Sequence, residues 1–193
     1  MRFLTFFLTL PLVLAAAGDD GSGIGGGGGP FVRYYLHDNR DVDPDFGGGF
    51  LVVGGRGYGA VTEWLRVGGG GAASLTVLGA PDDGNVSQNL SYGGLILEPF
   101  LDLKDELSIS LPILIGGGSY EFQRIIEEAG NDRYSVELYE AGFFCLETGV
   151  EVTWTPLGWF GLGFHGGYVW IVCEEDRFTG SGFAGLMLFF GLG

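Results

Sequence analysis

The sequence has little positive charge. Lys104 is its single lysine, and Lys and Arg together number 9 against 24 Asp and Glu, which gives a net charge of −15. Without a basic stripe to neutralise phosphates, nucleic acid is excluded as a partner. Two cysteines cannot frame a disulfide-rich scaffold, and their spacing fits no zinc site. From Pro30 onward almost no segment has the helical period of 3.6, which argues against a helical fold.

Glycine and aromatic residues are abundant, with 39 Gly and 16 Phe among 193 residues. At the N-terminus, Arg2 precedes an apolar run over 3–14 and the small residues of 15–17. This run is shorter than the roughly 20 residues of a membrane-spanning helix. The pattern predicts a signal peptide over residues 1–17, which a peptidase removes after Ala17. Residues 18–29 are predicted to form a flexible glycine-rich leader, and residues 30–193 a single domain.

Apolar residues alternate with polar or small ones in eight segments, and this period of two predicts β-strands. The predicted strands cover residues 30–37, 50–58, 64–75, 90–101, 107–117, 143–154, 159–172 and 182–192. The connections are alternately long and short, and the long ones carry most of the acidic residues. Outer-membrane barrels have short periplasmic turns and longer external loops. We therefore predict an all-β fold: an up-and-down antiparallel eight-stranded transmembrane β-barrel, preceded by a cleaved signal peptide.

The two faces of the later strands differ in polarity. In 159–172, for example, Phe160, Leu162 and Phe164 alternate with Gly161 and Gly163. A soluble barrel places its bulky apolar residues inside, whereas a barrel in lipid places them outside. We expect the apolar face to contact lipid and the face of small and charged residues to line a narrow lumen. Aromatic residues near strand ends are expected to form girdles at the membrane interfaces: Tyr92, Phe100, Trp154, Trp159, Phe160, Tyr168, Trp170 and Phe190.

Several ionisable residues have the inward parity. Burying an unpaired ion costs several kcal/mol, so these residues must meet one another or water. They are predicted to form an ion-pair network that closes the lumen: Arg33, Arg56, Arg66, Glu98, Glu147, Glu151 and His165.

No catalytic pattern accompanies these residues. Glu147 and Glu151 are four residues apart on one strand, roughly 13 Å by strand rise, whereas a glycosidase pair needs about 5–10 Å. No nucleophile elbow accompanies His165. We predict a protein that is not an enzyme. Cys145 and Cys173 also share the inward parity, but a tight turn over 155–158 places residue 145 opposite about residue 168. A disulfide between the two cysteines would then require a bulge or a folded-back loop.

The predicted external loop over 38–47 contains a D-x-D-x-D-x-G run. Its Asp41, Asp43 and Asp45 could supply oxygen ligands for weak Ca²⁺ binding. An EF-hand would have glycine at the sixth position and glutamate at the twelfth, where this chain has Phe46 and Val52. A solvated acidic loop is the alternative, and no other cofactor is expected.

Glycine-weighted motifs recur from residue 25 to the end of the chain. They are the glycine run before Pro30, Gly54-Gly55-Arg56-Gly57, Arg66–Gly71, Tyr92-Gly93-Gly94, Glu147–Glu151 and the segment from Ser181-Gly182 to Phe190-Gly191. On these motifs the chain resembles small glycine-rich outer-membrane β-barrel proteins of Gram-negative bacteria, a group without an assigned function. The resemblance implies a barrel in the cell outer membrane and implies no particular activity.

The sequence favours a non-enzymatic, structural or surface-interaction role, with acidic external loops. Outer-membrane lipid is the expected surrounding, and an extracellular protein or a glycan the expected kind of partner. Two alternatives stay open. A soluble secreted barrel could bind an apolar ligand, with the faces reversed, or the chain could be a secreted subunit of an extracellular fibre.

Overall fold

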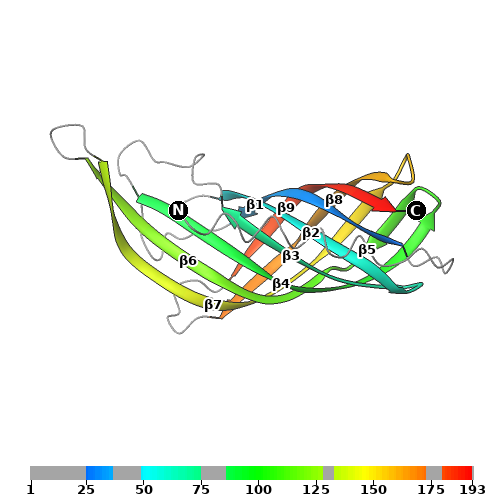
Figure 1. Cartoon of the computed structure of the whole chain (residues 1–193), viewed down its shortest axis with the longest axis horizontal. Coiled ribbons are helices and arrows are strands. Elements are labelled where there is room, and N and C mark those ends of the chain that lie inside the picture. The colour runs from blue at the N-terminus through cyan, green and yellow to red at the C-terminus, as the bar shows by residue number, and fades with distance from the viewer. Residues whose placement is uncertain (1–24, 37–48, 75–85, 128–132, 173–179, 193) are drawn as a thin grey trace.

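A computed structural model describes residues 25–36, 49–74, 86–127, 133–172 and 180–192. They form a closed antiparallel β-barrel (Figure 1). Its strands are β1 Gly26–Leu36, β2 Phe50–Thr62, β3 Leu65–Ser74, β4 Val86–Lys104, β5 Leu107–Ser110, β6 Ile113–Glu127, β7 Arg133–Trp154, β8 Phe160–Val172 and β9 Gly180–Leu192. Within these residues no helix is long and apolar enough to cross a membrane.

The nine strands occupy eight positions around the barrel, here called staves. Strands β5 and β6 both lie between β4 and β7, and only Leu111 and Pro112 separate them. Proline has no N–H to donate to a neighbouring strand, which interrupts the stave at this point. The Pro112 carbonyl still accepts a hydrogen bond from the Gly149 amide at 3.2 Å. Pairing of β1 with β9 closes the barrel, so the predicted up-and-down eight-stranded fold is confirmed.

The leader contributes to the barrel. Strand β1 begins at Gly26, inside the segment predicted to be flexible, and Gly26–Gly29 pair with β2 while Gly26–Gly28 also pair with β9. Strand pairing uses the backbone, which glycine supplies as well as any residue. A β-carbon on Gly27 would lie 2.3 Å from the Phe189 ring, so the close approach of that ring requires glycine here.

The ends of the barrel differ. At one end, the short-turn end, residues 63–64, 105–106 and 155–159 connect the strands. At the other end, β6 and β7 continue as a long hairpin, which lies at the left of Figure 1. The predicted connection over 118–142 is therefore wrong, because most of it is strand and only residues 128–132 separate β6 from β7.

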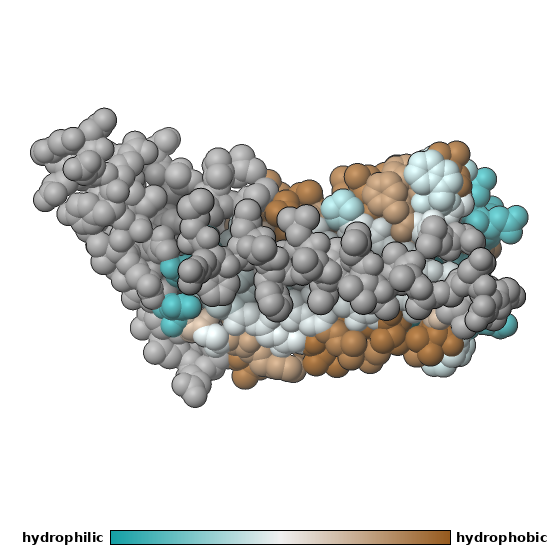
Figure 2. All heavy atoms as spheres, in the orientation of Figure 1, coloured by the Kyte–Doolittle hydropathy of each residue, from teal (hydrophilic) through white to brown (hydrophobic). Residues whose placement is uncertain are grey.

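The exterior of the barrel is apolar. Large hydrophobic side chains point outward along the staves, including Phe164 at 61% exposure and Leu186 at 56%. Figure 2 shows brown, hydrophobic residues along the visible body and teal, hydrophilic ones at the short-turn end. Such a band is unfavourable in water and suits the hydrocarbon of a bilayer. The predicted assignment of the two faces agrees with this burial pattern.

Two residues of the predicted aromatic girdles lie inside the barrel. Tyr92 is 3% exposed, and the Phe100 ring packs 3.9 Å from the Arg66 guanidinium carbon. Both have the parity of the buried Glu98 on β4, and side chains at even spacing share one face of a strand. The girdle assignment was wrong for these two residues because it was based on their position near a strand end and not on the face of the strand to which they belong. The Trp154, Trp159, Tyr168 and Trp170 side chains are exposed.

Candidate functional site

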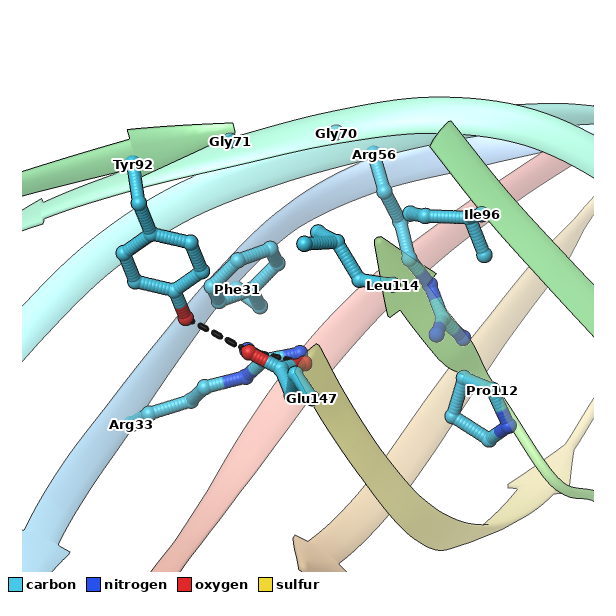
Figure 3. Close-up of a pocket in the computed structure, with 10 residues that line it drawn as sticks. All are labelled: Phe31, Arg33, Arg56, Gly70, Gly71, Tyr92, Ile96, Pro112, Leu114 and Glu147. Carbon is cyan, nitrogen blue, oxygen red and sulfur yellow. Dashed lines mark hydrogen bonds and ion pairs between the residues drawn. The ribbon is translucent and has the colours of Figure 1, made fainter. Parts of the chain in front are cut away.

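The lumen contains two groups of ionisable side chains. In the first, the Arg33 Nη1 donates to both Glu147 carboxylate oxygens at 2.7 Å and to the Tyr92 hydroxyl at 3.1 Å. The Tyr92 hydroxyl donates to Glu147 Oε2 at 2.7 Å, and Tyr35 is bonded to Tyr92 in turn. Figure 3 shows Arg33, Glu147 and Tyr92 converging from three different strands. All four side chains are buried, so this ion pair is fully removed from solvent.

The second group surrounds Arg56. Its Nη2 donates to Glu151 Oε1, which also accepts from Thr153 at 3.1 Å. The Nη1 of Arg56 lies 3.4 Å from Glu98 Oε2, and Arg66 Nη1 donates to Glu98 Oε1 at 3.1 Å. The Arg66 guanidinium also lies over the rings of Phe100 and Tyr58. Three arginines therefore face three glutamates, and the formal charges within the lumen balance.

His165 joins the two groups. Its Nε2 accepts a hydrogen bond from Arg33 Nε at 2.8 Å, and its Nδ1 lies 3.5 Å from Glu151 Oε2. A guanidinium only donates, so Nε2 must hold a lone pair and the imidazole is neutral with its proton on Nδ1. The polar groups then run from Tyr35 through Arg33 and His165 to Arg66. Two of the links, from His165 to Glu151 and from Arg56 to Glu98 Oε2, are contacts between charged or polar groups and not hydrogen bonds.

Glycine makes room for these contacts. Strand pairing places Gly185 between Arg33 on β1 and His165 on β8, and the two longer side chains meet over it. Arg56 is likewise flanked by Gly29 on β1 and Gly70 on β3. An eight-stranded barrel has space for few large side chains, so each arginine needs small neighbours.

Gly185→Ala is expected to destabilise the barrel. Its added β-carbon would lie 2.3 Å from the Val32 carbonyl oxygen and 2.8 Å from the Arg33 Cγ. Overpacking of this kind costs about 1–3 kcal/mol. Gly59→Ala is the matched control, because a β-carbon there meets nothing within 4 Å. Urea unfolding in lipid vesicles measures both, and equal stability of the two variants would contradict the packing described here.

Little space is left in the lumen. The cavity between the two groups has a volume of about 10 Å³ and is lined by Arg33, Arg56 and Glu147 among others (Figure 3). That volume is about one water molecule. A larger polar cavity of about 170 Å³ opens at the short-turn end, where Arg66, Lys104 and Asp102 contribute to its walls. Neither of these two cavities is a large apolar one.

The structure brings the seven predicted lumen residues together. Six of them are buried, and Arg66 is half-buried at the edge of the larger cavity. Sequence reasoning missed Tyr35, Tyr92 and Thr153 as members of the same network. Their parity on β1, β4 and β7 matches that of Arg33, Glu98 and Glu151 and was the available signal.

Other predicted features lie wholly or partly outside the described residues. Asp41, Asp43 and Asp45 of the calcium hypothesis are not described, nor is Cys173. Cys145 is buried, without a disulfide, and lies opposite Ile171 rather than residue 168. The connection between the paired parts of β7 and β8 is longer than the predicted tight turn, and this shifts the partner of Cys145. Trp154, the last residue of β7, pairs with Leu162, while Phe160 and Gly161 pair only with β9. Among the described residues, no cluster of His, Cys, Asp or Glu could hold a metal ion.

The β6–β7 hairpin extends beyond the rest of the barrel. Pairing of β7 with β6 continues to Glu127 and Arg133. Among the described residues, pairing of β7 with β8 reaches Phe144 and Val172, and residues 173–179 lie outside the described ranges. Strand β4 covers the other edge of the hairpin as far as the pair Val86 and Arg124. Among the described strands, β6 and β7 thus project furthest from the barrel (Figure 1).

The architecture is that of an eight-stranded outer-membrane β-barrel. A solved structure of Ail, the attachment invasion locus protein of Yersinia pestis, in complex with the heparin analogue sucrose octasulfate, is similar with a TM-score of 0.52 and 11% identity, over 88% of this chain and 98% of that chain. A second structure of Ail has a TM-score of 0.49 and 12% identity, over 88% and 99% of the two chains. At this identity the likeness shows the fold. No protein-family model matches the sequence, and no curated protein matches it.

Proposed function

We propose that this chain is a barrel of the bacterial outer membrane with a surface-interaction role and no enzymatic activity. The observation that carries the proposal is the projecting β6–β7 hairpin on a barrel whose lumen is filled. A barrel of this kind offers its external end to other molecules. The expected signal peptide over 1–17 and the apolar exterior support this location.

The filled lumen supports a role outside the pore. Arginine and glutamate groups in it engage one another rather than a solute, and the free space between them is about 10 Å³. In this proposal the Arg/Glu pairs close the lumen, and the barrel is a rigid scaffold that supports the external segments. The weak Ca²⁺ binding expected from the sequence for Asp41, Asp43 and Asp45 is kept as part of this proposal.

The net charge of this chain favours a different partner from the polyanion with which the structurally similar Ail was solved. Ail was solved with a heparin analogue, which is a polyanion. The present chain has a net charge of −15, and its sequence over 118–142 has six acidic and two basic residues. Like charges repel at an interface, so an extracellular protein with a basic surface is favoured over a sulfated glycan.

Expression of the full chain in a Gram-negative host tests this proposal. We expect the protein in the outer-membrane fraction, with a gel mobility in SDS that changes on boiling, because a closed barrel resists detergent. Intact cells that display it should bind immobilised basic extracellular proteins more than cells without it, and heparin no more than those cells. A soluble product, or equal binding by both cell types, would contradict the proposal.

A further inference from the structure

His165 lies between the two ion-pair groups of the lumen. Its Nε2 accepts the hydrogen bond from Arg33 Nε at 2.8 Å, and its Nδ1 lies 3.5 Å from Glu151 Oε2. The side chain is buried, and the rings of Phe31 and Phe183 pack against it edge to face with centroid distances of 5.9 Å. The imidazole is therefore held in one position between a cation and an anion.

A proton on this imidazole would disturb the charge balance of the lumen. The charged groups that act on His165 are Arg33 on β1, Arg56 on β2 and Glu151 on β7. On its other side, β9 contains no titratable residue between Gly180 and Leu192. The ion pairs of the lumen already match three arginines with three glutamates. An imidazolium would add an uncompensated charge where the free space is about 10 Å³, and burying such a charge is unfavourable.

The charged ring has a second possible contact. Glu151 Oε2 and His165 Nδ1 are both buried, and neither atom has a hydrogen bond within the described part of the chain. An imidazolium donates from both nitrogens, so it can no longer accept from Arg33 and is attracted to the carboxylate. The lumen thus allows two arrangements, a neutral ring bonded to Arg33 and a charged ring bonded to Glu151.

We propose that the contact between Arg33 and His165 is an acid-sensitive latch, which joins the two groups at neutral pH and opens in acid. A proton from the solvent binds Nε2, an N–H bond forms there, and the Arg33 Nε–H loses its acceptor. Arg33 keeps its pair with Glu147, while the imidazolium pairs with Glu151. The barrel is less stable with the latch open, because the charges in the lumen no longer balance. The inference concerns the lumen and is independent of the proposed surface role.

Urea unfolding of the full chain in vesicles of zwitterionic lipid tests the latch at about pH 7.5 and about pH 5, between which a free histidine changes its charge. Histidine in an unfolded chain is half-protonated near pH 6.5, so a site that disfavours the proton loses up to roughly thirty-fold in its folding equilibrium constant. His165→Gln keeps one acceptor and one donor but does not titrate. We expect the acid-induced loss to be about ten-fold larger in the full chain than in His165→Gln. The carboxylates are common to both proteins, so their titration cancels.

Two further variants separate the latch from other effects of acid. His37→Gln is the matched control, since His37 is the second histidine of the chain and lies outside the described residues. It should lose as much stability in acid as the full chain. Arg33→Met removes a cation, so an imidazolium at His165 restores the balance of charge. Its deficit in folding equilibrium constant relative to the full chain should be several-fold smaller at the lower pH.

Hydrogen exchange of the full chain tests the latch without a substitution. After correction for the intrinsic effect of pH, the backbone amides of residues 32–34 and 164–166 should exchange faster at the lower pH, because the contact that joins their side chains has opened. Unchanged exchange there would overturn the inference. An equal acid-induced loss in the full chain and His165→Gln would also overturn it, as would an equal deficit of Arg33→Met at both pH values. Loss of the acid effect in His37→Gln would assign the sensitivity to His37 instead and would equally exclude the latch.

Discussion

Arg33→Met is expected to destabilise the barrel by about 3–5 kcal/mol, the range found when one partner of a buried ion pair is removed. Methionine keeps the apolar stem of the side chain but not the guanidinium that lies over the Phe31 and Phe183 rings. Glu147 would keep only its hydrogen bond from Tyr92 among the contacts described above. His165 would also lose the donor to its Nε2. Urea unfolding in lipid vesicles, followed by tryptophan fluorescence, measures the loss.

Arg66→Met is the matched control for this variant. Arg66 borders the larger cavity, and its partner Glu98 keeps Arg56 when Arg66 is replaced, so the expected loss is smaller than that of Arg33→Met. The double variant Arg33→Met with Glu147→Gln should recover part of the stability, because it leaves no unpaired charge. Equal losses for Arg33→Met and Arg66→Met would show that the first pair is not a buried one.

Leu186→Arg is expected to block insertion, or to destabilise the inserted barrel by about 2–4 kcal/mol, as for a cation on the lipid face near the middle of a bilayer. Leu186 is exposed on β9 and lies beside Phe164, between the two ends of the barrel. Its neighbour in sequence, Met187, points into the lumen. The outer-membrane fraction and the unboiled gel band measure insertion, and vesicle unfolding measures stability.

Leu103→Arg provides the same change outside the apolar band. Leu103 is exposed on β4 next to the turn at the short-turn end, where a cation reaches water and the expected loss is about 0–1 kcal/mol. Full insertion and unchanged stability of Leu186→Arg would mean that this face is in water, and the barrel would then be a soluble one.

The hairpin and the leader could not be predicted from residue patterns. A half-buried strand is recognised by a regular alternation of apolar residues, and the segment over 118–142 alternates less clearly. The leader has no side chains from residue 25 to 29 and therefore no periodicity at all. Its pairing depends on the neighbouring strands β2 and β9, whose edges would otherwise be open.

Alternation of residues and the lengths of the connections were enough to predict the fold class from the sequence, and parity indicated which face of each strand points inward, because side chains alternate across a strand. It also determined that Arg33, Arg56, Glu98, Glu147, Glu151 and His165 share the interior. Only the tertiary structure decided which of them are partners. Arg33 bonds to His165 because Gly185 lies between them, and the register of three strands sets that arrangement.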